Sequence, residues 1–349
     1  MVRFDREPQK PAVAFVVLKV EFRDFWAGFD SRGNAFSDSF TRLGNIEVVD
    51  TGGDVCIYSC FGASHHTFKG CKVFVTAENL RPNFRDADFC IGFDHSDDHR
   101  YLRSPNWARG GVGASGLLRP YGDNIKEEPT EFCAFVVSNP WNPIRNQIFK
   151  ELSQHRYVHS PGQVFRNDSI NVDAHASHWD TSAVDYLRRF QFTIAAENSS
   201  YPGYTTEKLK HAFLAGSIPI YWGDPLVNHD FDPQAFLNFD DYGSVSALVQ
   251  AVLELAEDPA AMERMRSIAP LSQESWERSA NPYLMDSFFE RVFEVGGSPS
   301  YRRPAERREP SSRAMGLVHE VRAAGLAKAK GWRRRLKVRL LNRAVLRQR

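Results

Sequence analysis

The sequence predicts an α/β protein of two domains, and three observations support that fold class. Residues 192–225 follow the order strand, polar loop, helix, strand, because two apolar runs flank a loop rich in Asn, Ser, Pro and Gly. Further apolar runs separated by loops precede this stretch, a pattern typical of α/β sheets. The chain has 349 residues, more than one compact domain usually holds.

Four apolar runs predict the strands of a first domain, which we place at residues 1–130. The runs cover residues 11–22, 55–61, 72–76 and 89–93. Glu78 closely follows the third run, and reactive groups of α/β domains lie at the carboxyl edge of the sheet. Glu78 is therefore a candidate general base, with a solvated loop glutamate or a capping residue as the alternatives.

A second domain is predicted at residues 131–296. Its expected strands cover residues 133–137, 192–196 and 217–222. Its expected helices cover residues 144–153, 205–216, 244–257, 259–267 and 282–295. The last of these helices either caps the second domain or crosses back to the first.

The loop before the helix at 205–216 predicts an anion site. It joins the carboxyl end of a strand to a helix N-terminus, where free N–H groups and the helix dipole favour negative charge. Lys208 adds a positive charge in the first helical turn, so we expect a nucleotide diphosphate as ligand. Arg145 and Arg166 are further candidate phosphate ligands. Each of these three cations has a solvated surface residue as its alternative.

Two other residues of this stretch are candidates for contacts with a ligand. Glu207 is placed to accept hydrogen bonds from sugar hydroxyls, and Tyr204 to stack on a base. The structural alternative for Glu207 is a carboxylate that only stabilises the helix start. The alternative for Tyr204 is a core aromatic side chain.

No metal ion or other cofactor is predicted to be required. Three groups of residues resemble metal ligands in their spacing: Asp86 with Asp88, Asp230 with Asp232, and His65 with His66. Neither aspartate pair stands at a convincing strand end, and the histidines have no regular ligand spacing. The five cysteines are an odd number in strand-like segments, which favours reduced thiols in a cytosolic protein.

Composition indicates an ordinary globular protein with an unusual end. The chain is 42% hydrophobic and 25% charged, and it has no apolar run of membrane-spanning length and no secretory signal after Met1. Residues 297–349 are predicted to form a linker and a basic tail. The last 49 residues hold 16 of the 44 Lys and Arg but only three of the 43 acidic residues.

The segment 328–349 predicts attachment to a membrane surface. Trp332, Leu336 and Leu340 recur every four residues with arginines between them, a pattern suited to an anionic lipid surface. A nucleic-acid-binding tail and a merely solvated tail are the alternatives. We expect no nucleic-acid partner, and we expect a cytoplasmic protein held peripherally on the inner face of the membrane.

The stretch FTIAAENSSYPGYTTEKLKHAFLAGSIPIYWGDP strongly resembles the signature of the α-1,3/4-fucosyltransferases, glycosyltransferase family 10. The segments VFVTAENLRPNFRDADFCIGFD, RYLRSP and FVVSNPWNPIRNQIFKEL also look like blocks of that family, most of all of its bacterial members. The resemblance runs from about residue 55 to 240.

The resemblance implies a GT-B type fold, in which two Rossmann-like domains face a central cleft. The first domain would hold the acceptor and the second GDP-fucose, and transfer would invert the sugar without an obligatory metal. Glu78 matches the family's general base and Arg145 its donor-phosphate arginine. The other matching donor-binding positions are Asn198, Tyr204, Glu207 and Lys208. The role of Arg166 stays open, because the loop from it to Asn198 is longer than expected.

The expected reaction transfers L-fucose from GDP-fucose to a hydroxyl of GlcNAc or glucose in an oligosaccharide or lipopolysaccharide, in α-1,3 linkage. One alternative is a transferase of the same fold with another nucleotide sugar. Another is an inactive nucleotide-sugar-binding scaffold attached to the membrane. The choice between 1,3- and 1,4-linkage lies in first-domain loops such as residues 23–30.

Overall fold

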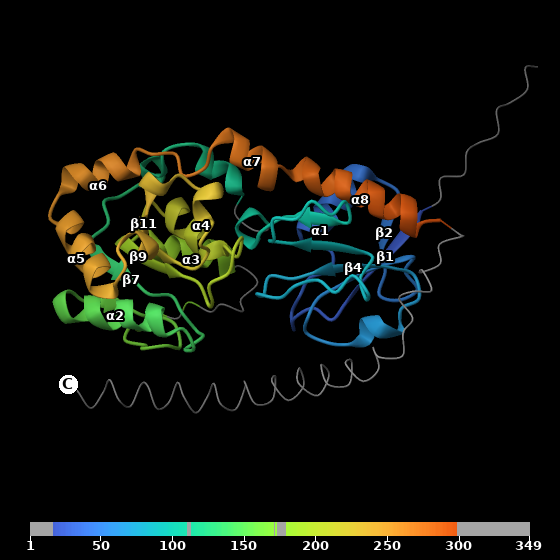
Figure 1. The fold of residues 1–349 in the computed structure, drawn as a ribbon, viewed down its shortest axis with the longest axis horizontal. Coiled ribbons are helices and arrows are strands. Elements are labelled where there is room, and N and C mark those ends of the chain that lie inside the picture. Colours follow the sequence, from blue (N-terminus) through green and yellow to red (C-terminus); the bar gives the residue numbers. More distant parts are fainter. Residues whose placement is uncertain (1–16, 110–112, 171, 173–178, 299–349) are drawn as a thin grey trace, which may run out of the picture.

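The structure is a computed structural model that describes residues 17–109, 113–170, 172 and 179–298, and it contains two parallel β-sheets (Figure 1). The first sheet has six strands in the order β2-β1-β3-β4-β5-β6. The second has five strands in the order β11-β10-β9-β7-β8. Neighbouring strands pair in parallel throughout both sheets. The predicted α/β class is confirmed.

The strands are short and mostly buried. Those of the first sheet are β1 (Leu18–Arg23), β2 (Ile46–Val48), β3 (Val55–Tyr58), β4 (Cys71–Val75), β5 (Phe89–Gly92) and β6 (Tyr101–Arg103). Those of the second are β7 (Glu131–Ala134), β8 (Val158–His159), β9 (Phe190–Ala196), β10 (Ile218–Trp222) and β11 (Leu237–Asn238). Every residue of β3, β4 and β5 is buried, which explains why these central strands are visible in the sequence as continuous apolar runs.

Eight α-helices lie in the described part of the chain. They are α1 (Ala35–Leu43), α2 (Pro143–His155), α3 (Trp179–Leu187), α4 (Glu207–Leu214), α5 (Val245–Ala256), α6 (Pro259–Arg266), α7 (Gln273–Ser279) and α8 (Pro282–Gly296). Side chains of Asn142, Ser244 and Asp258 accept hydrogen bonds from the first turns of α2, α5 and α6. These caps fix the helix starts close to the predicted positions.

Several elements differ from the prediction. The strand predicted at residues 133–137 begins and ends earlier, at Glu131–Ala134, because its pairing with β8 and β9 extends no further than Ala134. The first strand begins at Leu18, and the earlier part of the predicted segment, up to residue 16, lies outside the described residues. The elements that were not predicted are the strands β2, β6, β8 and β11 and the helices α1, α3 and α7.

The chain crosses between the two units twice. Helix α8 returns to the first sheet, where Phe288, Phe289 and Val292 are fully buried in its core (Figure 1). Conversely, Trp107 and Tyr121 are fully buried in the core of the second unit, although they precede residue 131. The sequence left open whether the last helix crosses back, and the structure shows that it does. Each packing unit is therefore discontinuous in sequence.

The carboxyl edges of the two sheets face each other. Asn79, after β4, donates from its amide to the Ser199 hydroxyl in the loop after β9, at 2.7 Å. The Arg81 guanidinium lies 3.2 Å from the centre of the Tyr201 ring in that same loop. Loops at the edges of both sheets thus form one junction, where ligands of α/β proteins usually bind.

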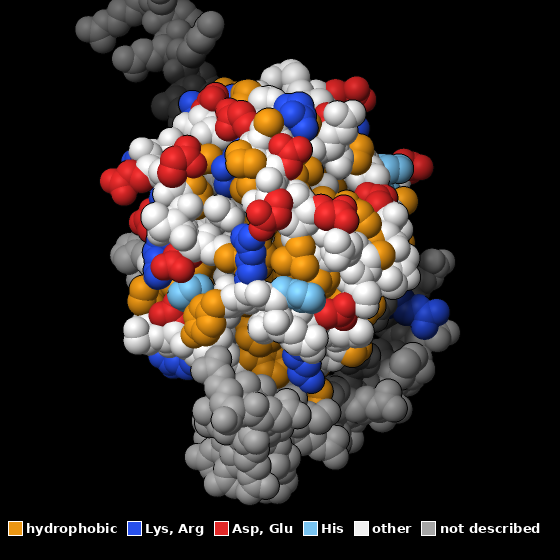
Figure 2. Space-filling view, turned by 90° about the vertical axis from the view of Figure 1, so that its left-hand side faces the viewer, with side chains coloured by type: hydrophobic (Ala, Val, Ile, Leu, Met, Phe, Trp, Pro, Cys, Tyr) orange, Lys and Arg blue, Asp and Glu red, His pale blue; other side chains and the backbone are white. Residues whose placement is uncertain are grey.

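The outer end of the second unit is an ordinary solvated surface. Figure 2 shows acidic, basic and apolar side chains interspersed over the described part of this face. The predicted basic tail lies beyond residue 298, outside the described residues. Within the described part, no helix has both the length and the apolar character needed to cross a bilayer.

Candidate active site

The loop between β9 and α4 is closed by a buried glutamate. Glu197 directly follows β9 and has no exposed surface, and its carboxylate accepts hydrogen bonds from the Thr206 backbone N–H at 2.7 Å and hydroxyl at 2.6 Å. The two ends of the loop are thereby tied together just before α4 begins. A protein carboxylate thus already uses a backbone donor at the helix start where the sequence predicted a ligand anion.

Lys208 lies between two carboxylates at this helix start. Its ammonium nitrogen is 3.4 Å from an oxygen of Glu197, 3.4 Å from one of Glu207 and 3.0 Å from the Thr206 hydroxyl. Burial would lower the pKa of Lys208, but the charges of Glu207 and Glu197 outweigh it and raise the pKa. Lys208 is therefore a fixed cation at neutral pH.

The pKa values of the two carboxyl groups are shifted in opposite directions. Burial raises the pKa of Glu197, with the Lys208 charge opposing the shift. Burial acts in the same direction on Glu207, yet Lys208 and His211 outweigh it and lower the pKa of Glu207 to about 2. Glu207 also accepts a hydrogen bond from a residue that follows the first sheet, since the Asn106 amide donates to its Oε2 at 2.6 Å. An ionised acceptor at this position suits the recognition of hydroxyl groups.

Arg145 lies inside the protein behind the loop. Its side chain is fully buried and donates to Asn198 Oδ1 at 2.9 Å, to the Ala196 and Glu197 carbonyls, and to the Asn139 carbonyl. Burial lowers the pKa of Arg145 to about 10, which leaves the guanidinium charged at neutral pH. Arg145 thus orients Asn198 and places a positive charge behind the loop.

Tyr204 packs at the contact between the two units. It is buried, and its ring centre lies 5.0 Å from that of Phe93, which follows β5 of the first sheet. Burial raises the pKa of the Tyr204 phenol, and the nearby carboxylates of Glu197 and Glu78 raise it further. Tyr204 is therefore a neutral core aromatic at the junction.

Glu78 is the exposed carboxylate of this junction. Its backbone N–H donates to the Thr76 hydroxyl at 2.9 Å, which turns the chain sharply after β4. Its charge acts on the Tyr204 phenol, so Glu78 and the β9–α4 loop border the same space. An exposed carboxylate in this place has access to a ligand held between the sheets.

The structure brings most of the predicted site residues together around the β9–α4 loop. These are Glu78, Arg145, Asn198, Tyr204, Glu207 and Lys208. Arg166 is exposed on the loop after β8, and no described contact joins it to the others. Sequence patterns did not indicate Glu197 or Asn106, whose roles come from contacts between distant segments.

Among the residues whose spacing resembles that of metal ligands, several have protein partners in the structure. Asp230 is buried and forms an ion pair with Arg103 at 2.6 Å, across the two units. His65, His66 and Asp86 have ligand atoms within 4.8 Å of one another. The Lys72 ammonium lies 3.5 Å from Asp86, so this cluster contains its own cation.

Comparison with known proteins matches both units to family models. Residues 20–109 match the model described as alpha-(1,3)-fucosyltransferase FucT N-terminal domain. Residues 126–267 match the model of glycosyltransferase family 10 (fucosyltransferase), C-terminal part. Together the two matches cover more than half of the chain.

Curated relatives share the same description. The chain is 32% identical to alpha-(1,3)-fucosyltransferase FucT of Helicobacter pylori over 204 residues, which are 49% of this chain and 41% of the relative. It is 34% identical to human 4-galactosyl-N-acetylglucosaminide 3-alpha-L-fucosyltransferase 9 over 129 residues, 36% of this chain and 33% of the relative. The chain spans less than half the length of these relatives.

Solved structures show the same fold. A crystal structure of an alpha1,3-fucosyltransferase with GDP-fucose superposes with a TM-score of 0.64 at 22% identity, covering 86% of this chain and 96% of that one. Another, of alpha1,3-fucosyltransferase, has a TM-score of 0.65 at 23% identity and covers 79% of this chain and 90% of that one. The predicted GT-B type fold is confirmed.

Proposed function

The chain belongs to glycosyltransferase family 10, the fucosyltransferases, and on that premise we propose that it transfers L-fucose from GDP-fucose to a hydroxyl of GlcNAc or glucose in a glycan. One observation carries this proposal. Glu78 lies on one side of the junction, and Asn198, Glu207 and Lys208, in the β9–α4 loop and at the start of α4, lie on the other. The human relative is a 4-galactosyl-N-acetylglucosaminide 3-alpha-L-fucosyltransferase, which supports GlcNAc as the acceptor sugar and α-1,3 as the linkage.

The proposed reaction is a single displacement that inverts the sugar. The acceptor oxygen forms a bond to fucose C1 while the bond from C1 to the β-phosphate oxygen breaks, and its electron pair leaves with GDP. Glu78 takes the proton of the attacking hydroxyl from the face opposite GDP, as the general base of inverting glycosidases does. The ionised Glu207 accepts hydrogen bonds from fucose hydroxyls.

Negative charge on the departing GDP is stabilised by fixed positive charge in this proposal. Lys208 is kept protonated by two carboxylates, and Arg145 supplies charge from behind Asn198. With these groups in place, we expect turnover to be independent of an added divalent ion. Equal rates in EDTA and in Mg²⁺ are the expected result, and a strict Mg²⁺ requirement would contradict this part of the proposal.

The substitution Glu78→Gln tests the proposed general base. We expect the rate of GDP release with N-acetyllactosamine as acceptor to fall about 10²- to 10⁴-fold, because the amide cannot take the proton. GDP affinity measured by calorimetry should be unchanged. Glu127→Gln, at an exposed position, is the matched control. Near-wild-type transfer by Glu78→Gln would remove Glu78 as the base.

The basic segment 328–349 supports a second part of the proposal, peripheral attachment to an anionic membrane on its cytoplasmic side. Full-length protein should pellet with phosphatidylglycerol vesicles at physiological salt, whereas a chain ending at Ser298 should stay in the supernatant. Equal pelleting of the two chains would contradict attachment through this segment.

A further inference from the structure

We propose that Arg109 is a positioning residue for Glu78, and that the segment from Asn106 to Arg109 connects the two halves of the active site. The inference rests on the proposed function, because it assigns Glu78 the role of the base. The segment follows β6 of the first sheet and begins with the short 3-10 helix η2 (Asn106–Ala108). Its two ends contact opposite sides of the junction.

One end of the segment contacts the loop of the base. Arg109 donates from Nη2 to the Thr76 carbonyl at 2.7 Å. Thr76 is the residue from which the chain turns toward Glu78, since its hydroxyl accepts the Glu78 N–H at 2.9 Å. The guanidinium therefore fixes the peptide just before the base. A displacement of about 1 Å at such a position can cost roughly 10² in rate.

The other end contacts the donor side. Asn106 donates to Glu207 Oε2 at 2.6 Å, and Lys210 of helix α4 donates to the Arg109 carbonyl at 3.4 Å. Between them, Trp107 is fully buried in the core of the second unit, where its ring centre lies 4.9 Å from that of Phe231. The segment is anchored in the second unit and reaches back to the first.

The charge of Arg109 has no counterpart among the described residues. Burial lowers its pKa to about 10, and no described carboxylate pairs with it; the groups that oppose the shift are the Tyr101 phenol and the Cys90 thiol. Its Nε also lacks a hydrogen-bond partner within the described part. A partly buried arginine bound chiefly to one neutral carbonyl contributes little to stability, so positioning of that carbonyl accounts better for the arrangement.

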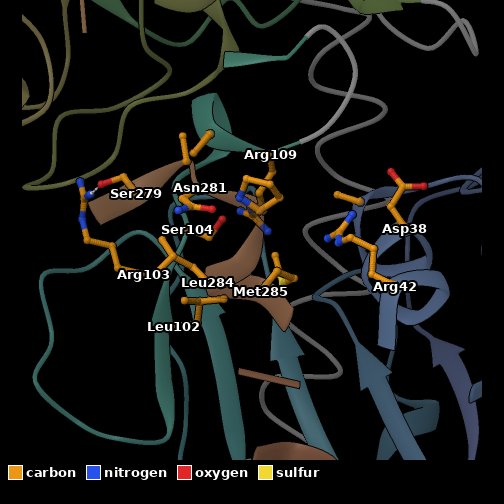
Figure 3. Close-up of a pocket in the computed structure, with 14 residues that line it drawn as sticks. Asp38, Arg42, Leu102, Arg103, Ser104, Arg109, Ser279, Asn281, Leu284 and Met285 are labelled. Atoms are coloured by element: carbon orange, nitrogen blue, oxygen red, sulfur yellow. Dashed lines mark hydrogen bonds between the residues drawn. The ribbon is translucent and has the colours of Figure 1, made fainter. Parts of the chain in front are cut away.

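The surroundings of Arg109 make substitution practical. Figure 3 shows its side chain above a pocket between helix α1, strand β6 and the start of helix α8, with Ser104 and Met285 also lining it. Because one side of Arg109 borders open space, Arg109→Met fits without overpacking and removes both the charge and the donor. Arg109→Lys keeps a charge and a donor. Arg119→Met, at an exposed arginine of the same connecting region, is the matched control.

The test compares kinetics of these variants with GDP-fucose and N-acetyllactosamine. We expect Arg109→Met to lower kcat about 10- to 100-fold while the KM for GDP-fucose stays within about twofold, because the donor side is intact. Arg109→Lys should recover part of kcat, and Arg119→Met should equal wild type. Hydrogen exchange of the peptide that contains Thr76 and Glu78 should increase in Arg109→Met alone.

Each contrary result has a distinct meaning. A large rise in KM for GDP-fucose with unchanged kcat would show that Arg109 binds the donor and would overturn the inference. Unchanged kinetics and unchanged exchange in Arg109→Met would overturn it as well. If wild type fails to transfer fucose, the proposed function falls, and the exchange experiment still decides whether Arg109 orders the loop of Glu78.

Discussion

Arg145 shows at the scale of a single residue how one buried side chain organises a binding loop. Arg145 joins the end of β9, the loop residue Asn198 and the segment before α2 through five hydrogen bonds. Four of these come from the side chain, and the fifth is accepted by Asn142 from the Arg145 backbone. The residue that the sequence indicated as a phosphate ligand is thus also a structural centre of the second unit.

We predict that Arg145→Met lowers the free energy of unfolding by about 2–4 kcal/mol. The substitution keeps the apolar stem but removes the guanidinium donor from the carbonyls of Asn139, Ala196 and Glu197, of which Glu197 keeps only the Asn142 amide. Urea denaturation followed by tryptophan fluorescence measures the change. Arg264→Met, at an arginine whose side chain is 70% exposed, should change it by less than about 0.5 kcal/mol. Equal stability of the two variants would contradict the role given to Arg145.

Sequence reasoning indicated candidate charged residues for the site but not the contacts that set their state. Lys208 was indicated because a strand, a loop and a helix start follow one another in the sequence. The bond from Asn106 to Glu207 joins residues 101 positions apart, so no local pattern reveals it. Glu197 begins the polar loop within residues 192–225, a place that favours exposure, yet it is fully buried. Burial of that kind depends on the packing of both ends of the loop.

The start of helix α4 carries several charged side chains, and their contribution to the stability of the fold depends on pH. Glu207 has a folded pKa of about 2 against a reference value of 4.5, since Lys208 and His211 outweigh the effect of its burial. A carboxyl group with a depressed pKa contributes stability that is complete above its unfolded pKa. That contribution is lost as the pH falls from about 4.5 toward 2.

We therefore expect the stability difference between wild type and Glu207→Gln to shrink as the medium is acidified. The difference should decrease by about 1–3 kcal/mol between pH 6 and pH 2, because protonation of Glu207 removes the charge that the variant already lacks. Urea unfolding at a series of pH values measures it, with Glu127→Gln as the control at an exposed glutamate. A difference that stays constant with pH would show that Glu207 is not stabilised as a carboxylate.

Fully buried strands inside the sheets were among the most predictable elements. The strands β3, β4, β5 and β10 lie in the middle of their sheets and were found as apolar runs. Helix α1 was missed because its sequence, AFSDSFTRL, is rich in residues that favour caps and turns. Its start is set by Asn34, which forms a capping box with Ser37. Strand β6 is three residues long, too short for a periodic pattern.

The whole molecule is held together by segments that leave one unit and pack on the other. Helix α8 covers the first sheet beside α1, and Asp286 on α8 accepts hydrogen bonds from Arg42 at 2.7 Å and Ser39 at 2.5 Å. The helix was predicted from its apolar spacing, but spacing does not say which sheet an apolar face will cover. Only the tertiary structure shows that α8 packs on the first sheet.

We predict that Phe289→Ala on α8 destabilises the first sheet selectively. Phe289 is fully buried against Phe40 of α1, with ring centres 4.9 Å apart, so its removal should cost about 3–5 kcal/mol. Hydrogen exchange of peptides from β3 and β4 should become faster, while peptides from β9 and β10 keep their protection. GDP affinity should be retained, because the donor loop belongs to the second unit.

Tyr283→Ala is the matched control for this prediction, since the Tyr283 side chain on the same helix is 66% exposed. It should leave exchange in both sheets unchanged. Faster exchange of β9 and β10 in Phe289→Ala, to the same degree as β3 and β4, would mean that the two units unfold as one. In that case the contacts at the junction, such as the pair of Arg103 with Asp230, would bind the units more tightly than α8 binds the first sheet.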